Sequence, residues 1–185
     1  MLVLVCALAV AGCQSPPQAQ LGPDGKPLPV AYRITPREEA EIPVRVLQQV
    51  NALRANVGAP PLMPNPMLDA AARAHARDMS AQNRAWHFGS DGSSPLDRVR
   101  RMGYSDHLIG ENISETYENE IATLNAWMQN RDTRDVIMDP RASELGFGWY
   151  QEPSGKLWWV LLTGGAPTIP PVASEGFAGA GASAS

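Results

Sequence analysis

Cysteine is almost absent from this chain of 185 residues, which contains two, Cys6 and Cys13, both close to its start. When that start is treated as a leader segment, the folded part has no thiol for a disulfide bond or for a thiolate metal site. Disulfide frameworks and cysteine-ligated zinc modules are therefore excluded. The stability of the domain has to come from the packing of its hydrophobic residues, which make up an ordinary 44% of the sequence.

Positive charge is also scarce. The chain has 15 Lys and Arg residues against 19 Asp and Glu residues, so its formal net charge at pH 7 is −4. Nucleic-acid binding requires a basic face, and this balance argues against such a partner. Arg98, Arg100 and Arg101 do lie close together. On a short helix, such a cluster is more typical of a solvated face than of a phosphate site.

The apolar run at residues 2–10 is far shorter than the roughly 20 residues that a membrane-spanning helix needs. It leads into Ala11-Gly12-Cys13, and small residues before a cysteine resemble the bacterial lipobox. We therefore predict a lipoprotein signal peptide over residues 1–12 and a membrane anchor through lipid on Cys13. A plain signal peptide and a buried helix are the alternatives. Gln14 differs from the aspartate of an inner-membrane retention signal, which favours the outer membrane with the domain facing the periplasm.

The rest of the chain has the organisation of one domain between two extended segments. Residues 13–35 are rich in Pro, Gln and Gly, which predicts a flexible tether. Residues 166–185 are mostly Pro, Gly, Ala and Ser without a hydrophobic pattern, which indicates a disordered tail. Residues 36–165 have the length of a single domain. We expect this domain to be a monomer.

Start signals predict two helices in the first half of this domain. Residues 35–38, Thr-Pro-Arg-Glu, have a capping-box pattern, although Pro43 could also open the helix, which continues to Gly58. Asn65 followed by Pro66 is a cap with proline at the first helical position, and this helix runs to about Gln82. Both helices are amphipathic.

The second half of the domain mixes a helix with strands. Apolar residues at helical spacing predict a third helix, on which Trp127 is a core anchor. The charged residues 131–135 are interpreted as a turn. Residues 146–150 and 156–162 have the character of two strands joined by a tight turn. Periodicity therefore places the domain in the α+β class.

Residues 86–115 contain the two side chains best suited to chemistry, His87 and Glu111. Glycines and short polar residues after His87 predict a turn. Ser94 followed by Pro95 predicts the start of a short helix, and Gly103 stands where a capping glycine would end it. A neutral imidazole and a carboxylate can bind zinc, and either group can act as a general base near neutral pH.

The order of the motifs in this chain resembles the CAP domain. The motifs are an aromatic-His pair, G-S-D-G-S-S-P-x-D-R, G-Y, G-E-N-I, Trp-Met, G-x-G and an aromatic-rich last strand. The CAP domain is the SCP-like extracellular domain of cysteine-rich secretory proteins, venom allergens, plant pathogenesis-related proteins and many bacterial secreted proteins. The resemblance covers roughly residues 44–165. It implies an α-β-α sandwich with a small antiparallel sheet between helices.

The resemblance also implies a site. In the family, a histidine and a glutamate at the positions of His87 and Glu111 line a central cleft, and with a second histidine they can hold a divalent metal. That second histidine follows the Trp of the Trp-Met pair by six residues, where this chain has Thr133. The implied ligand cleft is therefore His87, Glu111 and Thr133. Threonine is a poor zinc ligand, which leaves two weak candidates where catalytic zinc usually has three protein ligands.

Two other histidines and a structural alternative bear on this pair. His107 would complete a metal site only if its segment folded back toward Glu111. His75 lies on the apolar face of its helix and is expected to be a half-buried, hydrogen-bonded structural residue.

The alternative for the pair of His87 and Glu111 is that Glu111 and Asn112 satisfy backbone groups at a bend and that His87 bonds across the turn. The sequence leaves both interpretations open.

Two functional hypotheses follow. The first is a non-enzymatic, extracytoplasmic ligand-binding module of the bacterial envelope that presents its cleft to a lipid, a cell-wall component or another protein. The resemblance implies binding roles of this kind, and the family's members do not share one reaction. The second is a metal-dependent or serine-type hydrolase that uses His87 and Glu111.

The serines near His87 give little support to the hydrolase. They are Ser90, Ser93 and Ser94. Ser94 is better explained as a helix cap, and no nucleophile-elbow pattern such as G-x-S-x-G is present. The sequence therefore favours a binding module over an enzyme.

Overall fold

The structure is a computed structural model that describes residues 32–166. The predicted signal peptide, Cys13, most of the tether and all but the first residue of the predicted tail lie outside the described residues. The elements are α1 (Pro36–Ala55), β1 (Met63–Pro64), α2 (Pro66–Gln82), α3 (Pro95–Arg101), β2 (His107–Thr116), α4 (Glu120–Gln129), α5 (Arg131–Met138), β3 (Glu144–Gln151) and β4 (Leu157–Gly165). Within residues 32–166, no helix combines the length and the apolar character that crossing a membrane requires.

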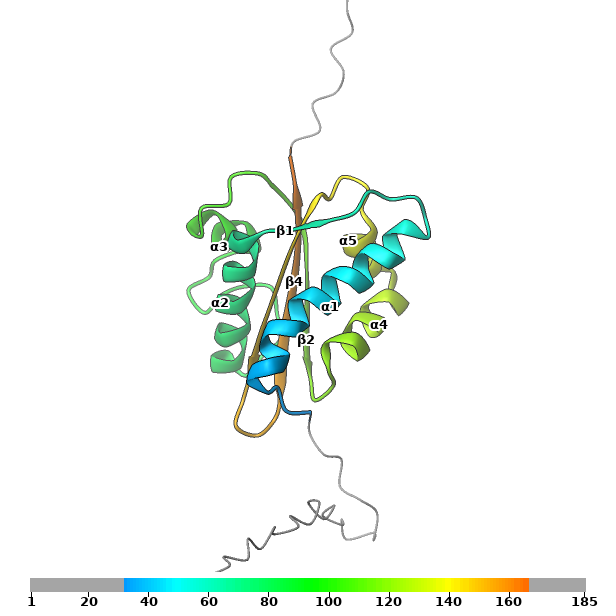
Figure 1. Ribbon diagram of the computed structural model, residues 1–185. Coiled ribbons are helices and arrows are strands. Elements are labelled where there is room, and N and C mark those ends of the chain that lie inside the picture. Colours follow the sequence, from blue (N-terminus) through cyan, green and yellow to red (C-terminus); the bar gives the residue numbers. More distant parts are fainter. Residues whose placement is uncertain (1–31, 167–185) are drawn as a thin grey trace, which may run out of the picture. The chain divides into compact units, whose positions relative to one another are not determined.

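A four-stranded sheet lies between two layers of helices (Figure 1). The strand order is β1-β3-β4-β2, so β2 forms one edge of the sheet. Helices α2 and α3 cover one face, and α1, α4 and α5 cover the other. The α-β-α sandwich that the family resemblance implies is confirmed.

The sheet is mixed, whereas the resemblance implies an antiparallel one. β4 pairs antiparallel with both β2 and β3. β1 runs parallel to β3, with Met63 opposite Glu144 and Pro64 opposite Leu145. The expectation is therefore wrong at this edge. A strand of two residues is too short for any periodicity to reveal it.

The predicted helix starts are confirmed by their caps. The Thr35 side chain accepts from the Glu38 N–H and the Glu38 carboxylate accepts from the Thr35 N–H, so α1 begins at Pro36 and Pro43 lies inside it. The Asn65 side chain caps α2. Ser94 caps α3 in the same reciprocal manner as Thr35. These side chains satisfy backbone donors that the first helical turn leaves free.

Residues 131–135 are helical, so their interpretation as a turn is wrong. They begin α5, whose first turn is capped by the Asn130 side chain accepting from the Asp132 N–H at 3.0 Å. Ile137 is fully buried on this helix. Burial of one apolar face stabilises a short helix whose sequence is otherwise strongly charged.

The two glycines of the G-x-G motif allow α2 to lie very close to β3. A Cβ atom at Gly146 would be 2.3 Å from the Leu68 Cβ, and one at Gly148 would be 2.3 Å from the Arg73 backbone nitrogen. Both distances are far inside ordinary contact. The glycines therefore fix the position of α2, which carries His75 toward the sheet.

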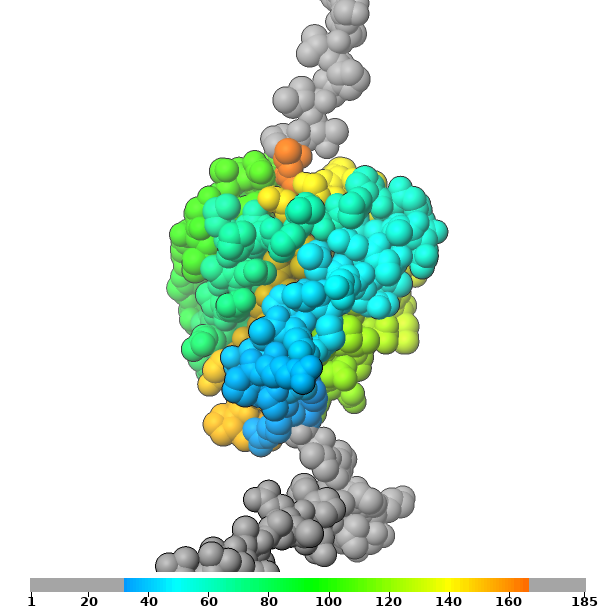
Figure 2. All heavy atoms as spheres, viewed as in Figure 1, coloured from blue at the N-terminus to red at the C-terminus, as the bar shows by residue number. Residues whose placement is uncertain are grey.

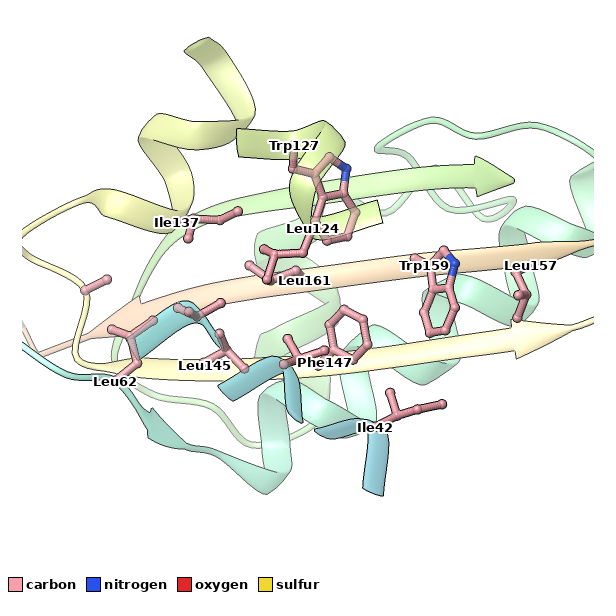
Figure 3. Packing of buried hydrophobic residues seen from close by; sticks show 13 residues of the cluster. Ile42, Leu62, Leu124, Trp127, Ile137, Leu145, Phe147, Leu157, Trp159 and Leu161 are labelled. Carbon is pink, nitrogen blue, oxygen red and sulfur yellow. The ribbon is translucent and has the colours of Figure 1, made fainter. Parts of the chain in front are cut away.

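The larger hydrophobic core lies between the sheet and α1, α4 and α5 (Figure 3). Phe147 and Trp159, on neighbouring strands, stack with ring centroids 5.5 Å apart. Trp127 of α4 is buried against this core, as predicted for an anchor. A second core lies between the sheet and α2 and α3, where three alanines of α2 pack near larger side chains such as Trp158 and Tyr104.

Candidate functional site

Glu111 and Asn112 lie within β2 and not at a bend. Neighbouring side chains in a strand point to opposite faces of the sheet. The Glu111 carboxylate contacts the side covered by α2 and α3, where Arg98 lies. The Asn112 amide donates to the Thr133 carbonyl oxygen at 2.7 Å on α5. Asn112 thus satisfies a backbone group, as the structural alternative expected, but Glu111 does not.

The Glu111 carboxylate is buried and both of its oxygens are engaged. Its side chain is 2% exposed. The His87 Nδ1 lies 2.9 Å from Oε1, and the Arg98 Nη2 donates to Oε2 at 2.6 Å. The structure therefore brings together the two residues that the sequence singled out and adds a third.

Arg98 is buried on α3, so the prediction of a solvated arginine face is wrong for this residue. Its side chain is 8% exposed. Besides Glu111, its guanidinium donates to the carbonyl oxygens of His87 at 2.9 Å and Ser93 at 3.1 Å. Removing a charge from water is costly unless it is paired and hydrogen-bonded, and Arg98 is both. Its place in the G-S-D-G-S-S-P-x-D-R motif was the signal that could have found it.

His75 of α2 lies behind this pair and is fully buried, where the sequence predicts half-burial. Its Nε2 is 3.0 Å from the Trp86 carbonyl oxygen, which can only accept, so Nε2 carries the proton. Nδ1 then has no hydrogen-bond partner among the described residues. Burial lowers the pKa of His75, although nearby Glu111 opposes this shift. A neutral His75 thus holds the backbone of the residue that precedes His87.

His87 is presented at the surface, with its side chain 52% exposed. Its Nδ1 faces Glu111, and its Nε2 has no hydrogen-bond partner in residues 32–166. Phe88 beside it is 49% exposed. The Trp86 ring lies 5.6 Å from the Phe88 ring and 4.0 Å from the Arg84 guanidinium. The His87 imidazole is therefore held in place by the buried Glu111 carboxylate and lies in a loop that also contains two aromatic rings and an arginine.

Thr133 does not join this group. Its hydroxyl donates to the Trp127 carbonyl oxygen at 2.6 Å. It belongs to α5, on the face of the sheet opposite the one that Glu111 contacts. The expected three-residue cleft is therefore reduced to His87 and Glu111, joined by Arg98 and His75.

His107 is also separate. It is exposed at the start of β2, opposite Gly165. Four residues of strand place it about 13 Å along β2 from Glu111.

The residues present do not fit a zinc ion. Both Glu111 oxygens have partners, and one partner is a guanidinium that would repel a cation. His87 alone offers a nitrogen without a partner. Over the described range, no group of three or more His, Cys, Asp or Glu side chains is placed to hold a metal.

The neighbouring serines do not form a nucleophile-base pair with His87. The Ser90 hydroxyl donates to Asp78 at 2.6 Å. The Ser94 hydroxyl bonds the Asp97 carboxylate as part of its cap. No serine hydroxyl in the described part of the chain is hydrogen-bonded to the His87 ring.

Comparisons with known proteins agree with the fold. Residues 47–162 match the family model described as the cysteine-rich secretory protein family, CAP. The chain is 31% identical over 120 residues to the uncharacterized protein YkwD of Bacillus subtilis (strain 168). That alignment covers 65% of this chain and 46% of YkwD, so the match spans less than half the length of that relative.

Two solved structures have the same fold at low sequence identity. An outer surface protein from Borrelia burgdorferi superposes with a TM-score of 0.64 at 17% identity, covering 74% of this chain and 99% of its own. An extracellular protein containing a SCP domain from Bacillus anthracis str. Ames superposes with a TM-score of 0.58 at 23% identity, covering 71% of this chain and 44% of its own.

Proposed function

Because the chain belongs to the cysteine-rich secretory protein (CAP) family, we propose that it is a non-enzymatic ligand-binding module of the bacterial envelope. The observation that carries this proposal is the contrast in exposure between His87, 52%, and Glu111, 2%, at a separation of 2.9 Å. A buried ion pair fixes an imidazole that remains open to a ligand. Preorganised polar groups of this kind give binding sites their orientation and specificity.

The surroundings of His87 support a ligand with both polar and apolar parts. Phe88 and Trp86 offer ring faces, and the His87 Nε2 offers one hydrogen-bonding atom. Cell-wall fragments and lipids combine such parts. We therefore place the ligand at the loop of residues 84–88, which packs against α2 through the bond between Trp86 and His75.

The proposed location is extracytoplasmic, with the chain held at the outer membrane by lipid on Cys13. The names of the two structural relatives, an outer surface protein and an extracellular protein, support the first part. The lipobox-like Ala11-Gly12-Cys13 supports the second. In cells that carry Cys13→Ser, we expect the chain to move from the detergent phase to the aqueous phase in Triton X-114 partitioning. A wild-type chain that is found in the aqueous phase would contradict lipid anchoring.

The binding proposal is tested by NMR titration of the full chain. The probes are soluble peptidoglycan fragments and vesicles of phosphatidylglycerol with phosphatidylethanolamine. We expect one probe to shift the amide signals of His87 and Phe88, and His87→Ala to weaken its binding about tenfold, the loss of one good polar contact. His107→Ala is the matched control, because His107 is also exposed but lies on β2, away from the loop that contains His87. Shifts confined to other parts of the chain would contradict the proposed site.

Hydrolysis is the alternative, and one observation favours it. The Glu111 carboxylate orients the His87 ring at 2.9 Å, which is the relation of an orienting acid to a general base. The same titration decides between the two hypotheses. A binding module leaves the peptidoglycan fragments or lipids unchanged, as followed by mass spectrometry. Product formation that His87→Ala abolishes would replace binding with catalysis.

A further inference from the structure

A hollow in the surface lies between α1 and α2, and none of its lining residues belongs to the His87 loop. Its volume is about 420 Å³, within the roughly 300–1,000 Å³ range of ligand pockets. Figure 2 shows the face of the molecule on which these two helices lie next to each other. The lining residues are Pro36, Glu39 and Ala40 of α1, Arg73 and Arg77 of α2, and Trp149 of β3.

The floor of this groove is an edge of the sheet without a strand partner. β1 pairs with β3 only as far as Leu145. Two backbone groups of β3 point away from β4, toward the free edge. The Leu145 carbonyl accepts from the Asn65 N–H at 2.9 Å, and the Phe147 N–H donates to Asp69 at 2.8 Å. The register with β4 is regular, and alternate residues face the same way. The Trp149 N–H and C=O therefore also face outward, and no bond joins them to another described residue.

Two arginines stand along this edge on one face of α2. Arg73 and Arg77 are one helical turn apart and both are exposed. The Arg73 guanidinium lies 5.8 Å from the Trp149 ring centroid, and that of Arg77 lies 5.5 Å from the Tyr150 ring centroid. Neither forms an ion pair with a described carboxylate, and Glu39 is the single acid that lines the groove. The lining thus has two positive charges against one negative charge, and the half-buried Asp69 at the same edge, whose pKa burial raises, reduces this excess.

The chain itself shows how extended backbone is held at the end of this edge. The Gln151 carboxamide accepts from the Ile34 N–H at 3.0 Å and donates to the Tyr32 carbonyl at 2.6 Å. The Gln151 side chain thus makes the two hydrogen bonds, one accepted and one donated, that the backbone of a paired strand residue would make. Arg33 donates to the Pro153 carbonyl at 2.7 Å on the same side. This segment therefore already lies beside the β3–β4 turn, and it leads into Pro36, which lines the groove.

We propose that this groove binds an acidic peptide segment of a partner protein, which adds a short strand to the free edge of β3. Backbone pairing with Trp149 supplies the strand contacts, and carboxylates on the peptide pair with Arg73 and Arg77. Strand addition gives affinity through the main chain and specificity through alternate side chains. The proposal is independent of the His87 site.

The test is fluorescence anisotropy with the full chain and a fluorescein-labelled AVEVEA peptide with an amidated C-terminus. Its two glutamates alternate and can therefore face α2 together. We expect it to bind at least tenfold more tightly than AVQVQA, and N-methylation of its central valine to weaken binding by a similar factor. AVQVQA with a free C-terminus shows whether a terminal carboxylate can replace the side chains. Equal binding of the Glu and Gln peptides would overturn the proposal.

The variants separate the groove from the rest of the surface. Arg73→Gln with Arg77→Gln should weaken binding at least tenfold, and Ala40→Trp should block the groove without changing its charge. Arg84→Gln is the matched control, because Arg84 is also exposed and stacked on an aromatic ring, 4.0 Å from that of Trp86. His87→Ala should bind the peptide normally, so failure here is distinguishable from failure of the proposed function. Competition by inorganic phosphate, with no effect of N-methylation, would show a simple anion site and overturn the peptide proposal.

Discussion

Two buried arginines, one on each side of the sheet, have different roles. Arg54 of α1 is fully buried, and its guanidinium donates to the carbonyl oxygens of Pro60, Ile137, Asp139 and Ala142 at 2.7 to 3.0 Å. Burial lowers its pKa. Arg98 instead donates to the Glu111 carboxylate and to two carbonyls.

The difference lies in what each arginine holds. Arg54 joins the end of α1 to the loop before β1, to the end of α5 and to the loop that follows α5, and every partner is backbone. Arg98 holds a side chain that in turn holds His87 at the surface. A buried arginine bound only to carbonyls therefore supports the fold, whereas one bound to a carboxylate beside an exposed imidazole supports a site.

The largest effect is expected at Arg54. Arg54→Met removes four hydrogen bonds from a charged donor, each worth about 1.5–3 kcal/mol, and leaves the carbonyls of the buried residues Ile137 and Ala142 without a donor. We expect the free energy of unfolding in urea to fall by at least about 4 kcal/mol. Arg131→Met, on the exposed start of α5, should change it little. A loss below about 1 kcal/mol at Arg54 would contradict its structural role.

The next largest loss of stability is expected at Glu111, and a second substitution at Arg98 should recover part of it. Glu111→Leu leaves the Arg98 charge buried without its partner, which costs about 3–5 kcal/mol. Adding Arg98→Met should recover part of that loss, because the pair is then removed together, while the carbonyl oxygens of His87 and Ser93 lose their donor. Urea unfolding of the two single variants and the double variant measures this. Additive losses would mean that the two side chains do not act as a pair.

The smallest effect is a pH dependence from His75. The pKa of His75 in the folded chain lies below the ordinary 6.5. As the pH falls through 6.5, this imidazole therefore binds a proton in the unfolded chain while it stays neutral in the folded chain. The free energy of unfolding should therefore fall as the pH is lowered from 7 to 5.5, by at most about 1 kcal/mol, the limit that titration of the unfolded imidazole sets. His75→Gln should remove this slope, while His107→Ala should keep it. The raised pKa of half-buried Asp69 acts in the opposite sense, so the comparison between variants isolates His75.

Local signals in the sequence were sufficient for the helix starts. Thr35, Asn65 and Ser94 cap helices through atoms two or three residues away, so short patterns contain the whole interaction. The strands of the β3–β4 hairpin were found for the same reason. The predicted pair of His87 and Glu111 came from the family resemblance, and their contact at 2.9 Å agrees with it.

Other features depend on which face of the sheet a residue occupies, and this could not be read from the sequence. Arg98 looked solvated because its partner is Glu111, thirteen positions away on a strand whose facing is set by pairing with β4. Thr133 was assigned to the cleft by its position in a motif, yet it belongs to α5 on the opposite face. The charged start of α5 hid a helix that tertiary packing stabilises.

The most direct test of this account concerns the claim that Glu111 belongs to Arg98 and His87 and is not free for a metal. The melting temperature of the full chain is recorded with and without excess zinc, next to His87→Ala. We predict no shift in either protein. Zinc at 100 times its dissociation constant would add about 2.7 kcal/mol of stability, or about 5–10 °C for a domain of this size. A rise of that size that is lost in His87→Ala would contradict the account.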